Sequence, residues 1–261
     1  MCLIVISLNN HPIYQLVLVA NRDEFYERPT KTANFWEEHP NLLAGKDILA
    51  GGTWLGLTTE GKFSALTNYR DVTNLKKNAP SRGNLVLNYL VNKYNPKEYI
   101  NTFKENEDLY NGFNLLIGNL NELYYYSNIS KEFLKINNGI HGLSNAFLNT
   151  SWQKVQKGKE KLTNILKNSK ISPDSLFEMM YDKEIASDDL LPNTGVGLEW
   201  ERKLSSMFIQ SPKYGTRCTT IILLDKNNNL LFGERIFLEG KPIEERIFNL
   251  ELSYDKNMNF L

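Results

Sequence analysis

A cysteine stands at the second position of this chain, directly after Met1. If Met1 is removed, Cys2 carries both a thiol and a free α-amino group, whose unperturbed pKa of about 7.7–8.0 leaves it substantially neutral near neutral pH. Such an amine can accept the thiol proton, directly or through a water, so that nucleophile and base come from one residue. The alternative interpretation is that Cys2 is a small buried residue of a core strand.

A charged segment follows a hairpin that begins at Cys2. Residues 2–8 and 14–20 are apolar runs joined by turn residues, and Asn-Arg-Asp-Glu follows at 21–24. Antiparallel pairing places residues 2–4 opposite residues of about 18–22, which brings Arg22 and Asp23 close to Cys2. An arginine and an aspartate there could lower the thiol pKa and orient its base. The competing interpretation is a strand end whose charges are paired in solvent.

Further candidate residues lie in segments rich in polar residues and glycine. Asn68 has a side-chain amide that could donate to an oxyanion. Arg217 enters a β-branched run, where a charge must be paired or line a cavity. Asn145 ends a strand expected near 139–145. Each of these features, taken alone, is more typical of a structural role.

The elements that must position these residues alternate between strands and helices. Both hairpin runs are almost continuously apolar, which is typical of strands covered on both faces. The whole order predicts one α+β domain over 1–261, in which sheets pack together and helices cover their outer faces. A lysine-rich helix at 151–167 is expected to present a solvated face, and residues 188–199 are expected to form a loop. The expected strands are 2–8, 14–20, 62–68, 113–118, 122–127, 216–225 and 230–238, with helices beginning near 81, 96, 151 and 172.

Composition excludes several classes of protein. The 261 residues include 30 basic and 30 acidic side chains, so the chain lacks the positive charge of a nucleic-acid binder or an anionic-membrane binder. Two cysteines exclude a disulfide scaffold and a four-cysteine metal site, and the three histidines lack metal-ligand spacing. No signal peptide or membrane-spanning run is evident, so we expect a cytoplasmic protein with reduced thiols, no metal and no integral membrane association.

The motifs together resemble the NRDE family, also called the transport and Golgi organisation protein 2 family. The resemblance covers residues 1 to about 240 and rests on Met-Cys at 1–2, Asn-Arg-Asp-Glu at 21–24, Gly-Gly-Thr-Trp-Leu-Gly at 51–56, Thr-Asn-Tyr-Arg at 67–70 and Tyr-Gly-Thr-Arg at 214–217. That family is similar to N-terminal-nucleophile hydrolases of the penicillin V acylase and bile salt hydrolase type. The similarity implies a four-layer αββα sandwich of two mostly antiparallel sheets, with Cys2 at the end of a central strand.

The resemblance also implies roles for single residues. Cys2 would be the nucleophile, and Arg22 and Asp23 would position it. Asn68 and Asn145 would be the asparagines near the amine and the oxyanion, and Arg217 the arginine of a late strand. In the acylases the arginine and the aspartate are three positions apart, whereas here they are adjacent. Adjacent strand side chains point to opposite faces, so only one of the two enters the site unless a bulge intervenes.

The leading hypothesis is a cysteine-dependent hydrolase or acyltransferase for a linear amide or acyl substrate, including acyl-CoA or lipid-like molecules, which requires no cofactor. The family is also associated with haem trafficking and with lipid or acyl-CoA homeostasis. The alternative is therefore a haem or lipid carrier that uses the same cleft, with Cys2 as a structural residue or an iron ligand. A third possibility is an inactive scaffold that acts through partner contacts.

Overall fold

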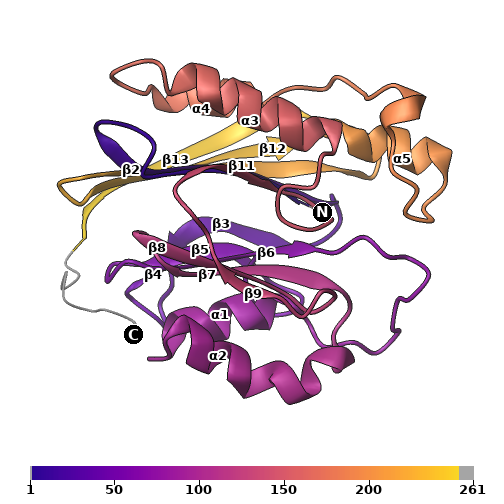
Figure 1. The fold of residues 1–261 in the computed structure, drawn as a ribbon, viewed down its shortest axis with the longest axis horizontal. Helices are drawn as coiled ribbons and strands as arrows, with labels where there is room; N and C mark the ends of the chain where they lie inside the picture. Colours follow the sequence, from indigo (N-terminus) through magenta and orange to yellow (C-terminus); the bar gives the residue numbers. More distant parts are fainter. Residues whose placement is uncertain (1, 253–261) are drawn as a thin grey trace.

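Two β-sheets pack face to face, and helices cover both outer surfaces (Figure 1). A computed structural model describes residues 2–252. The helices of residues 83–103 cover one sheet, and those of residues 153–180 cover the other (Figure 1). The predicted α+β class and its four-layer αββα arrangement are therefore confirmed.

The first sheet contains the amino-terminal hairpin at its centre. All of its neighbouring strands pair antiparallel, in the order β10-β1-β2-β11-β12-β13. Its strands are β1 (Cys2–Leu8), β2 (Tyr14–Phe25), β10 (Gly139–Leu143), β11 (Tyr214–Asp225), β12 (Asn229–Leu238) and β13 (Lys241–Glu251).

The second sheet follows chain order from one edge to the other. Its neighbouring strands also pair antiparallel, as β3-β4-β5-β6-β7-β8-β9. These strands are β3 (Thr30–Phe35), β4 (Leu42–Asp47), β5 (Leu55–Thr58), β6 (Lys62–Asn68), β7 (Phe113–Asn119), β8 (Glu122–Ser127) and β9 (Phe133–Lys135).

Five α-helices and two short 3₁₀ segments are present in the described range. Pro173 begins one helix after Ser172, as the sequence predicts. The helices are α1 (Gly83–Val91), α2 (Pro96–Phe103), α3 (Gln153–Ile165), α4 (Pro173–Met180) and α5 (Leu198–Ser205), and the 3₁₀ segments are Lys104–Leu109 and Asp188–Leu190.

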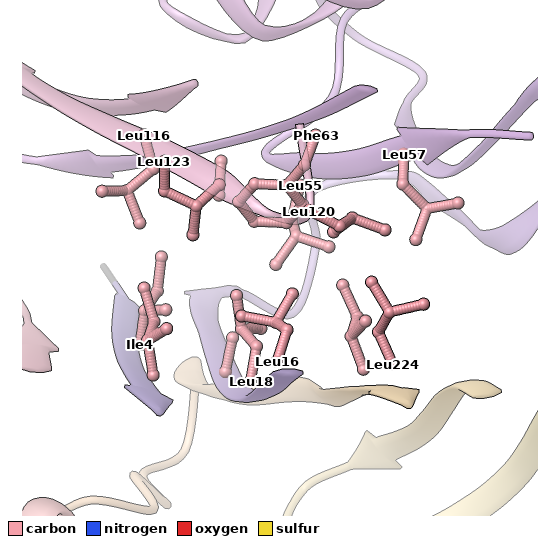
Figure 2. Packing of buried hydrophobic residues seen from close by; sticks show 14 of the residues in the cluster. Ile4, Leu16, Leu18, Leu55, Leu57, Phe63, Leu116, Leu120, Leu123 and Leu224 are labelled. Carbon is pink, nitrogen blue, oxygen red and sulfur yellow. The ribbon is translucent and has the colours of Figure 1, made fainter. Parts of the chain in front are cut away.

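The continuous apolar character of β1 reflects burial on both faces. Ile4 and Ile6 point between the sheets, whereas Leu3 and Val5 belong to a separate cluster under α3 and α4. Figure 2 shows side chains of the first sheet, including Ile4 and Leu18, facing residues of the second sheet such as Phe63. The site residues at the end of β1 therefore sit on a strand held from both sides.

Some elements differ from the sequence-based expectation. The strand expected at 14–20 continues as β2 through the charged segment to Phe25, because β11 pairs with it as far as Tyr214. The loop expected at 188–199 contains a 3₁₀ turn and gives way to α5 at Leu198. Strands β3, β4, β5 and β13 had no counterpart in the prediction. The charged edge strand β13, for example, is mostly exposed and so lacks an apolar run.

Candidate active site

Cys2 begins β1 and pairs with Arg22 of β2, which confirms the expected proximity of the two segments. The side chain of Cys2 is half-buried and lines a cavity of about 340 Å³. This cavity, called here the cleft, lies where β1 begins and where β2 and β6 end, against Trp54 and the segment 79–83 that leads into α1. Its volume falls in the range of small-molecule pockets.

Arg22 shares the inter-sheet face with Cys2. Its guanidinium lies 4.2 Å from the centre of the Trp54 ring, and its Nη1 donates to Thr30 Oγ1 at 3.4 Å. The face of an indole ring attracts a positive charge, and stacking on it holds a planar guanidinium in one orientation. Arg22 is thus a fixed positive charge beside the thiol.

Asp23 follows directly and points to the opposite face, toward the helices. Thr216 Oγ1 donates to Asp23 Oδ1 at 2.7 Å, and the hydroxyl of Tyr214 donates to the Asp23 carbonyl at 3.1 Å. Asp23 still contributes to the cleft lining, and its backbone N–H lowers the pKa of the Cys2 thiol. Adjacent residues of one strand therefore approach Cys2 from its two faces, which the alternation rule alone did not predict.

Asn68 and Asn145 occupy different positions relative to the cleft. Asn68 ends β6 and lines the cleft. Asn145 is buried behind it: its Nδ2 donates to the Asn68 carbonyl at 2.9 Å, and its own carbonyl accepts from the Arg70 N–H at 2.8 Å. The neighbouring Ser144 donates to the Cys2 carbonyl at 2.9 Å. Asn145 therefore fixes the backbone that carries Asn68.

Arg217 is the extra residue of a bulge in β11. Thr216 pairs with Asp23 and Cys218 pairs with Arg22, so that Arg217 lies outside the ladder. Its Nη1 donates to the carbonyls of Phe25 at 2.9 Å and Arg28 at 3.1 Å. Within residues 2–252, neither Arg217 nor Asn145 lines the cleft. The catalytic roles of both residues stay predictions. The hydrogen bonds of Arg217 hold the segment that follows β2 in place.

Three arginines lie in the cleft, and sequence reasoning identified only Arg22. Arg28 pairs with Asp47, with 2.7 Å between Nη2 and Oδ2. Arg82 precedes α1 and donates from Nη1 to the Gly112 carbonyl at 2.9 Å. Both residues lie in segments without a recognised motif, so only the fold brings them to Cys2.

Lys154 is a second residue that sequence reasoning missed. The helix at 151–167 was expected to present its lysines to solvent, but Lys154 is only 3% exposed. Its Nζ donates to the Leu204 carbonyl at 3.0 Å. The expectation was wrong for this residue because α5, which was not predicted, covers it. The buried positions 154, 155, 158 and 162 follow a helical spacing that could have indicated its burial.

The groups around Cys2 have opposing effects on the pKa of its thiol. Burial raises the pKa of the Cys2 thiol and the nearby Asp23 carboxylate raises it further, whereas Arg22 and the Asp23 backbone N–H lower it. Burial likewise raises the pKa of Asp23, against the lowering effects of Lys154, Thr216 and Arg70. The thiol therefore depends on neighbouring charges to become a nucleophile.

Comparison with known proteins identifies the family. The family model described as Transport and Golgi organisation 2 matches residues 1–239. The chain belongs to this family. Transport and Golgi organization protein 2 homolog from Bos taurus is 34% identical over 263 residues, covering 93% of this chain and 95% of the relative. The homolog from Homo sapiens is 35% identical over 260 residues, covering 92% and 94%.

Solved structures share the fold of this Transport and Golgi organisation 2 family member. A mutant of conjugated bile acid hydrolase from Clostridium perfringens, with alanine replacing cysteine at its position 2, matches with a TM-score of 0.51 and 10% identity, covering 98% of this chain and 99% of that one. A second variant of that hydrolase matches with a TM-score of 0.50 and 9% identity, covering 99% of each chain. The expected N-terminal-nucleophile hydrolase fold is therefore confirmed.

The described part of the chain has neither a cluster of metal-ligating side chains nor a membrane-spanning helix. No group of three or more His, Cys, Asp or Glu side chains is arranged there to hold a metal ion. None of the helices in residues 2–252 combines the length and apolar character needed to cross a bilayer. Both cysteines are free thiols.

Proposed function

We propose that this chain is an N-terminal-cysteine hydrolase or acyltransferase acting on a linear amide or acyl substrate. The observation that carries the proposal is the placement of Cys2, half-buried at the first position of a central strand and opening into the cleft between Arg22 and Asn68. The fold shared with conjugated bile acid hydrolase supports it, since the mutated residue of that enzyme is also a cysteine at position 2.

The proposed reaction begins once Met1 has been removed. The α-amino group of Cys2 takes the thiol proton, and the sulfur forms a bond to the substrate carbonyl carbon while the carbonyl π electrons move to oxygen. Collapse of this intermediate breaks the bond to the leaving group, which receives the proton from the α-ammonium. The product is a thioester on Cys2. Water, or another acceptor in a transferase, then attacks the thioester and restores the thiol.

Two donors are available for the oxyanion. The side-chain amide of Asn68 faces the cleft from the end of β6, on a backbone fixed by Asn145. The second candidate is the Asp23 backbone N–H, which lowers the pKa of the Cys2 thiol. Fixed donors of this kind stabilise charge that develops in the transition state.

The lining suggests how a substrate would lie. Trp54 and Leu66 offer apolar surface for an acyl chain, while Arg28 and Arg82 place charge elsewhere in the same cleft. A linear amphipathic molecule, such as an acyl-CoA or a lipid-like amide, matches a lining that combines apolar and charged side chains. We propose that the reaction takes place in the cytoplasm, where both thiols stay reduced.

One observation favours a binding function without catalysis. Burial raises the pKa of the Cys2 thiol, which reduces the thiolate fraction at neutral pH. In this second proposal the cleft holds a lipid or haem, and Cys2 is a structural residue or an iron ligand. A hemin titration tests it: a saturable Soret shift in wild type, retained in variants without turnover, supports the carrier, and absence of saturable binding contradicts it.

The hydrolase proposal is tested with protein whose loss of Met1 has been verified by intact mass. Wild type, Cys2→Ala and the control Cys218→Ala are compared on a panel of linear acyl amides and thioesters. Cys218 is a suitable control because it is buried on β11. We expect turnover in wild type and in Cys218→Ala and its loss in Cys2→Ala. Unchanged turnover in Cys2→Ala would rule out the proposed nucleophile.

A further inference from the structure

His141 lies on β10, the edge strand next to β1, and both nitrogens of its half-buried ring have hydrogen-bond partners. Nε2 lies 2.9 Å from the carbonyl oxygen of Asn137, which precedes the strand. Nδ1 lies 3.1 Å from the side-chain nitrogen of Asn149, which follows the strand. The ring therefore connects the chain before β10 with the chain after it.

The partners of the ring fix its protonation state. The carbonyl of Asn137 can only accept, so Nε2 of His141 carries a proton and donates it. The side-chain oxygen of Asn149 accepts from the Gly142 N–H at 3.0 Å, which leaves its Nδ2, a donor, facing Nδ1 of His141. Nδ1 therefore accepts and carries no proton. A second proton on the ring would place two donors against each other.

Asn149 cannot rotate its amide to suit a charged ring. Its backbone is left-handed, with φ of 61°, and its N–H donates to the Gly142 carbonyl at 2.8 Å. Lys159 of α3 also donates to its Oδ1, at 3.4 Å. Rotation would turn Nδ2 toward these two donors and replace one repulsive contact by others. The unit formed by His141, Gly142 and Asn149 is called here the His141 clamp.

The segment 144–149, which the clamp closes, supports two residues of the cleft. Ser144 donates to the Cys2 carbonyl at 2.9 Å, and Asn145 donates to the Asn68 carbonyl at 2.9 Å. The segment therefore contacts the first residue of β1 and the last residue of β6. Its far end is held by the clamp, through Asn149.

The middle of the same segment contacts the cleft-bearing loop a second time. The ring of Phe147 packs on Tyr69, the residue after Asn68, with 4.9 Å between the ring centres. Phe147, Asn149 and His141 also line a second cavity of about 270 Å³. Movement of the segment away from β10 would thus disturb Asn68 through both contacts.

We propose that His141 is a positioning residue for the cleft: its neutral ring holds the segment 144–149 against β10, and its protonation releases that segment. This role rests on the proposed function, in which Cys2 is the nucleophile and Asn68 an oxyanion donor. His141 lines the second cavity instead of the cleft, so it acts through the segment and touches no substrate.

The charges around the ring agree with a neutral imidazole. Burial has the largest effect and lowers the pKa of His141 below its ordinary value of 6.5, Lys159 lowers it further, and the hydrogen bond to the Asn137 carbonyl raises it. The folded segment therefore binds the proton less tightly than the released one. The clamp is complete above pH 6.5 and weakens as pH falls below that value. The other titratable groups along the second cavity are Tyr125 of β8, Glu132 of the turn after it and Lys135 of β9, which pairs with Glu122.

The test measures hydrogen exchange of two backbone amides by NMR, expressed as protection factors to remove the intrinsic pH dependence of exchange. The Asn149 N–H donates within the clamp, and the Arg70 N–H donates to the Asn145 carbonyl and so reports on the link to the cleft. The released ring titrates near 6.5. Both protection factors in wild type should therefore fall about tenfold when the pH is lowered from about 7.5 to about 5.5.

Three variants distinguish a titrating clamp from a purely structural histidine. His141→Gln keeps one donor and one acceptor and does not titrate, so its protection factors should not change over this pH range. Asn149→Asp keeps the acceptor for the Gly142 N–H but faces Nδ1 with a carboxylate oxygen, which favours the doubly protonated ring. Its protection factors should rise as the pH falls. His39→Gln removes a histidine between β3 and β4 and should resemble wild type.

Constant protection in wild type would overturn the proposal without any variant. A fall at Asn149 with no change at Arg70 would overturn the link to the cleft. A wild-type pH dependence in His141→Gln, or protection that falls with pH in Asn149→Asp, would also contradict the proposal, so that one folded variant is sufficient.

The clamp and the hydrolase fail separately, because hydrogen exchange requires neither a substrate nor reaction at Cys2. Turnover by a wild type whose protection is constant contradicts the clamp alone. The expected exchange results without turnover on any substrate support the clamp and contradict the hydrolase.

Discussion

Cys2, the first residue of β1, lies directly opposite Arg22 of β2, and both side chains face the space between the sheets. The pairing places a fixed guanidinium, stacked on Trp54, beside a half-buried thiol. Its consequence is that a positive charge acts on the candidate nucleophile before any substrate binds.

Removal of the Arg22 charge should reduce the reactivity of Cys2. Arg22 lowers the pKa of the thiol, so Arg22→Met should slow iodoacetamide alkylation at pH 7 by about tenfold. Arg22→Lys keeps the charge and loses the planar stack on Trp54, so its alkylation should stay closer to wild type. Arg202→Met, which removes an exposed pair with Asp188, serves as the control. Equal alkylation rates in all four proteins would contradict the assigned role.

The free energy of unfolding should fall with rising pH because ionised Asp23 is unfavourable in the folded protein. Its pKa in the folded protein is raised by burial, so the folded state holds the proton more tightly than the unfolded state. Stability from this group is fully present below its ordinary pKa of 3.8 and is lost as pH rises through the folded value. Asp23→Asn should therefore flatten this decline and unfold at higher denaturant concentration at neutral pH. Urea titrations at a series of pH values measure this dependence. A steeper loss of stability with rising pH in Asp23→Asn than in wild type would contradict the prediction.

The ion pair between Arg70 and Glu201 should be important for stability. Both side chains are almost fully buried, and Glu201 also accepts from the N–H and hydroxyl of Thr194. Glu201→Ala leaves an uncompensated buried charge and should lower the free energy of unfolding by about 3–5 kcal/mol. Glu199→Ala, on the exposed face of the same helix, should cause no measurable change. Similar urea midpoints for both variants would argue against the buried pair.

The close packing of α3 on β1 gives a further prediction. Gly158→Ala places a methyl group 2.8 Å from Val5 Cγ2, and the short, stiff valine has little room to move. Overpacking should cost about 1–3 kcal/mol despite the better helix propensity of alanine. Thr163→Ala, at an exposed position of α3, should be neutral or slightly stabilising. Thermal unfolding of both variants tests the difference, and a stabilised Gly158→Ala would show that α3 can move outward.

The sequence predicts those contacts of the site that are made between two strands of one hairpin. The apolar runs at 2–8 and 14–20 with a turn between them fix a hairpin, and antiparallel pairing then places Arg22 opposite Cys2 without further information. The family resemblance supplied the αββα sandwich and the roles expected for Asn68, Asn145 and Arg217, which the residues alone had marked only as candidates. The structure places Asn68 in the lining of the cleft and the other two outside that lining.

The missed features depend on contacts between distant segments. Glu201 lies 131 residues from Arg70, and the helix that carries it also covers Lys154. A lysine in an otherwise polar helix is normally solvated, and its burial becomes evident only when α5 is placed. The bulge at Arg217 is similar, because it is defined by the register between β2 and β11 and by no local sequence pattern.

The most direct measurement of the central claim is the mass of the covalent intermediate. Wild-type protein lacking Met1 is mixed with a linear acyl thioester, quenched in acid within the first turnovers, and analysed by intact and peptide mass spectrometry. We predict one acyl group per chain on the amino-terminal peptide at Cys2, absent in Cys2→Ala and present in Cys218→Ala. Turnover of the thioester by wild type with no acyl group on Cys2, or equal turnover by Cys2→Ala, would contradict the account.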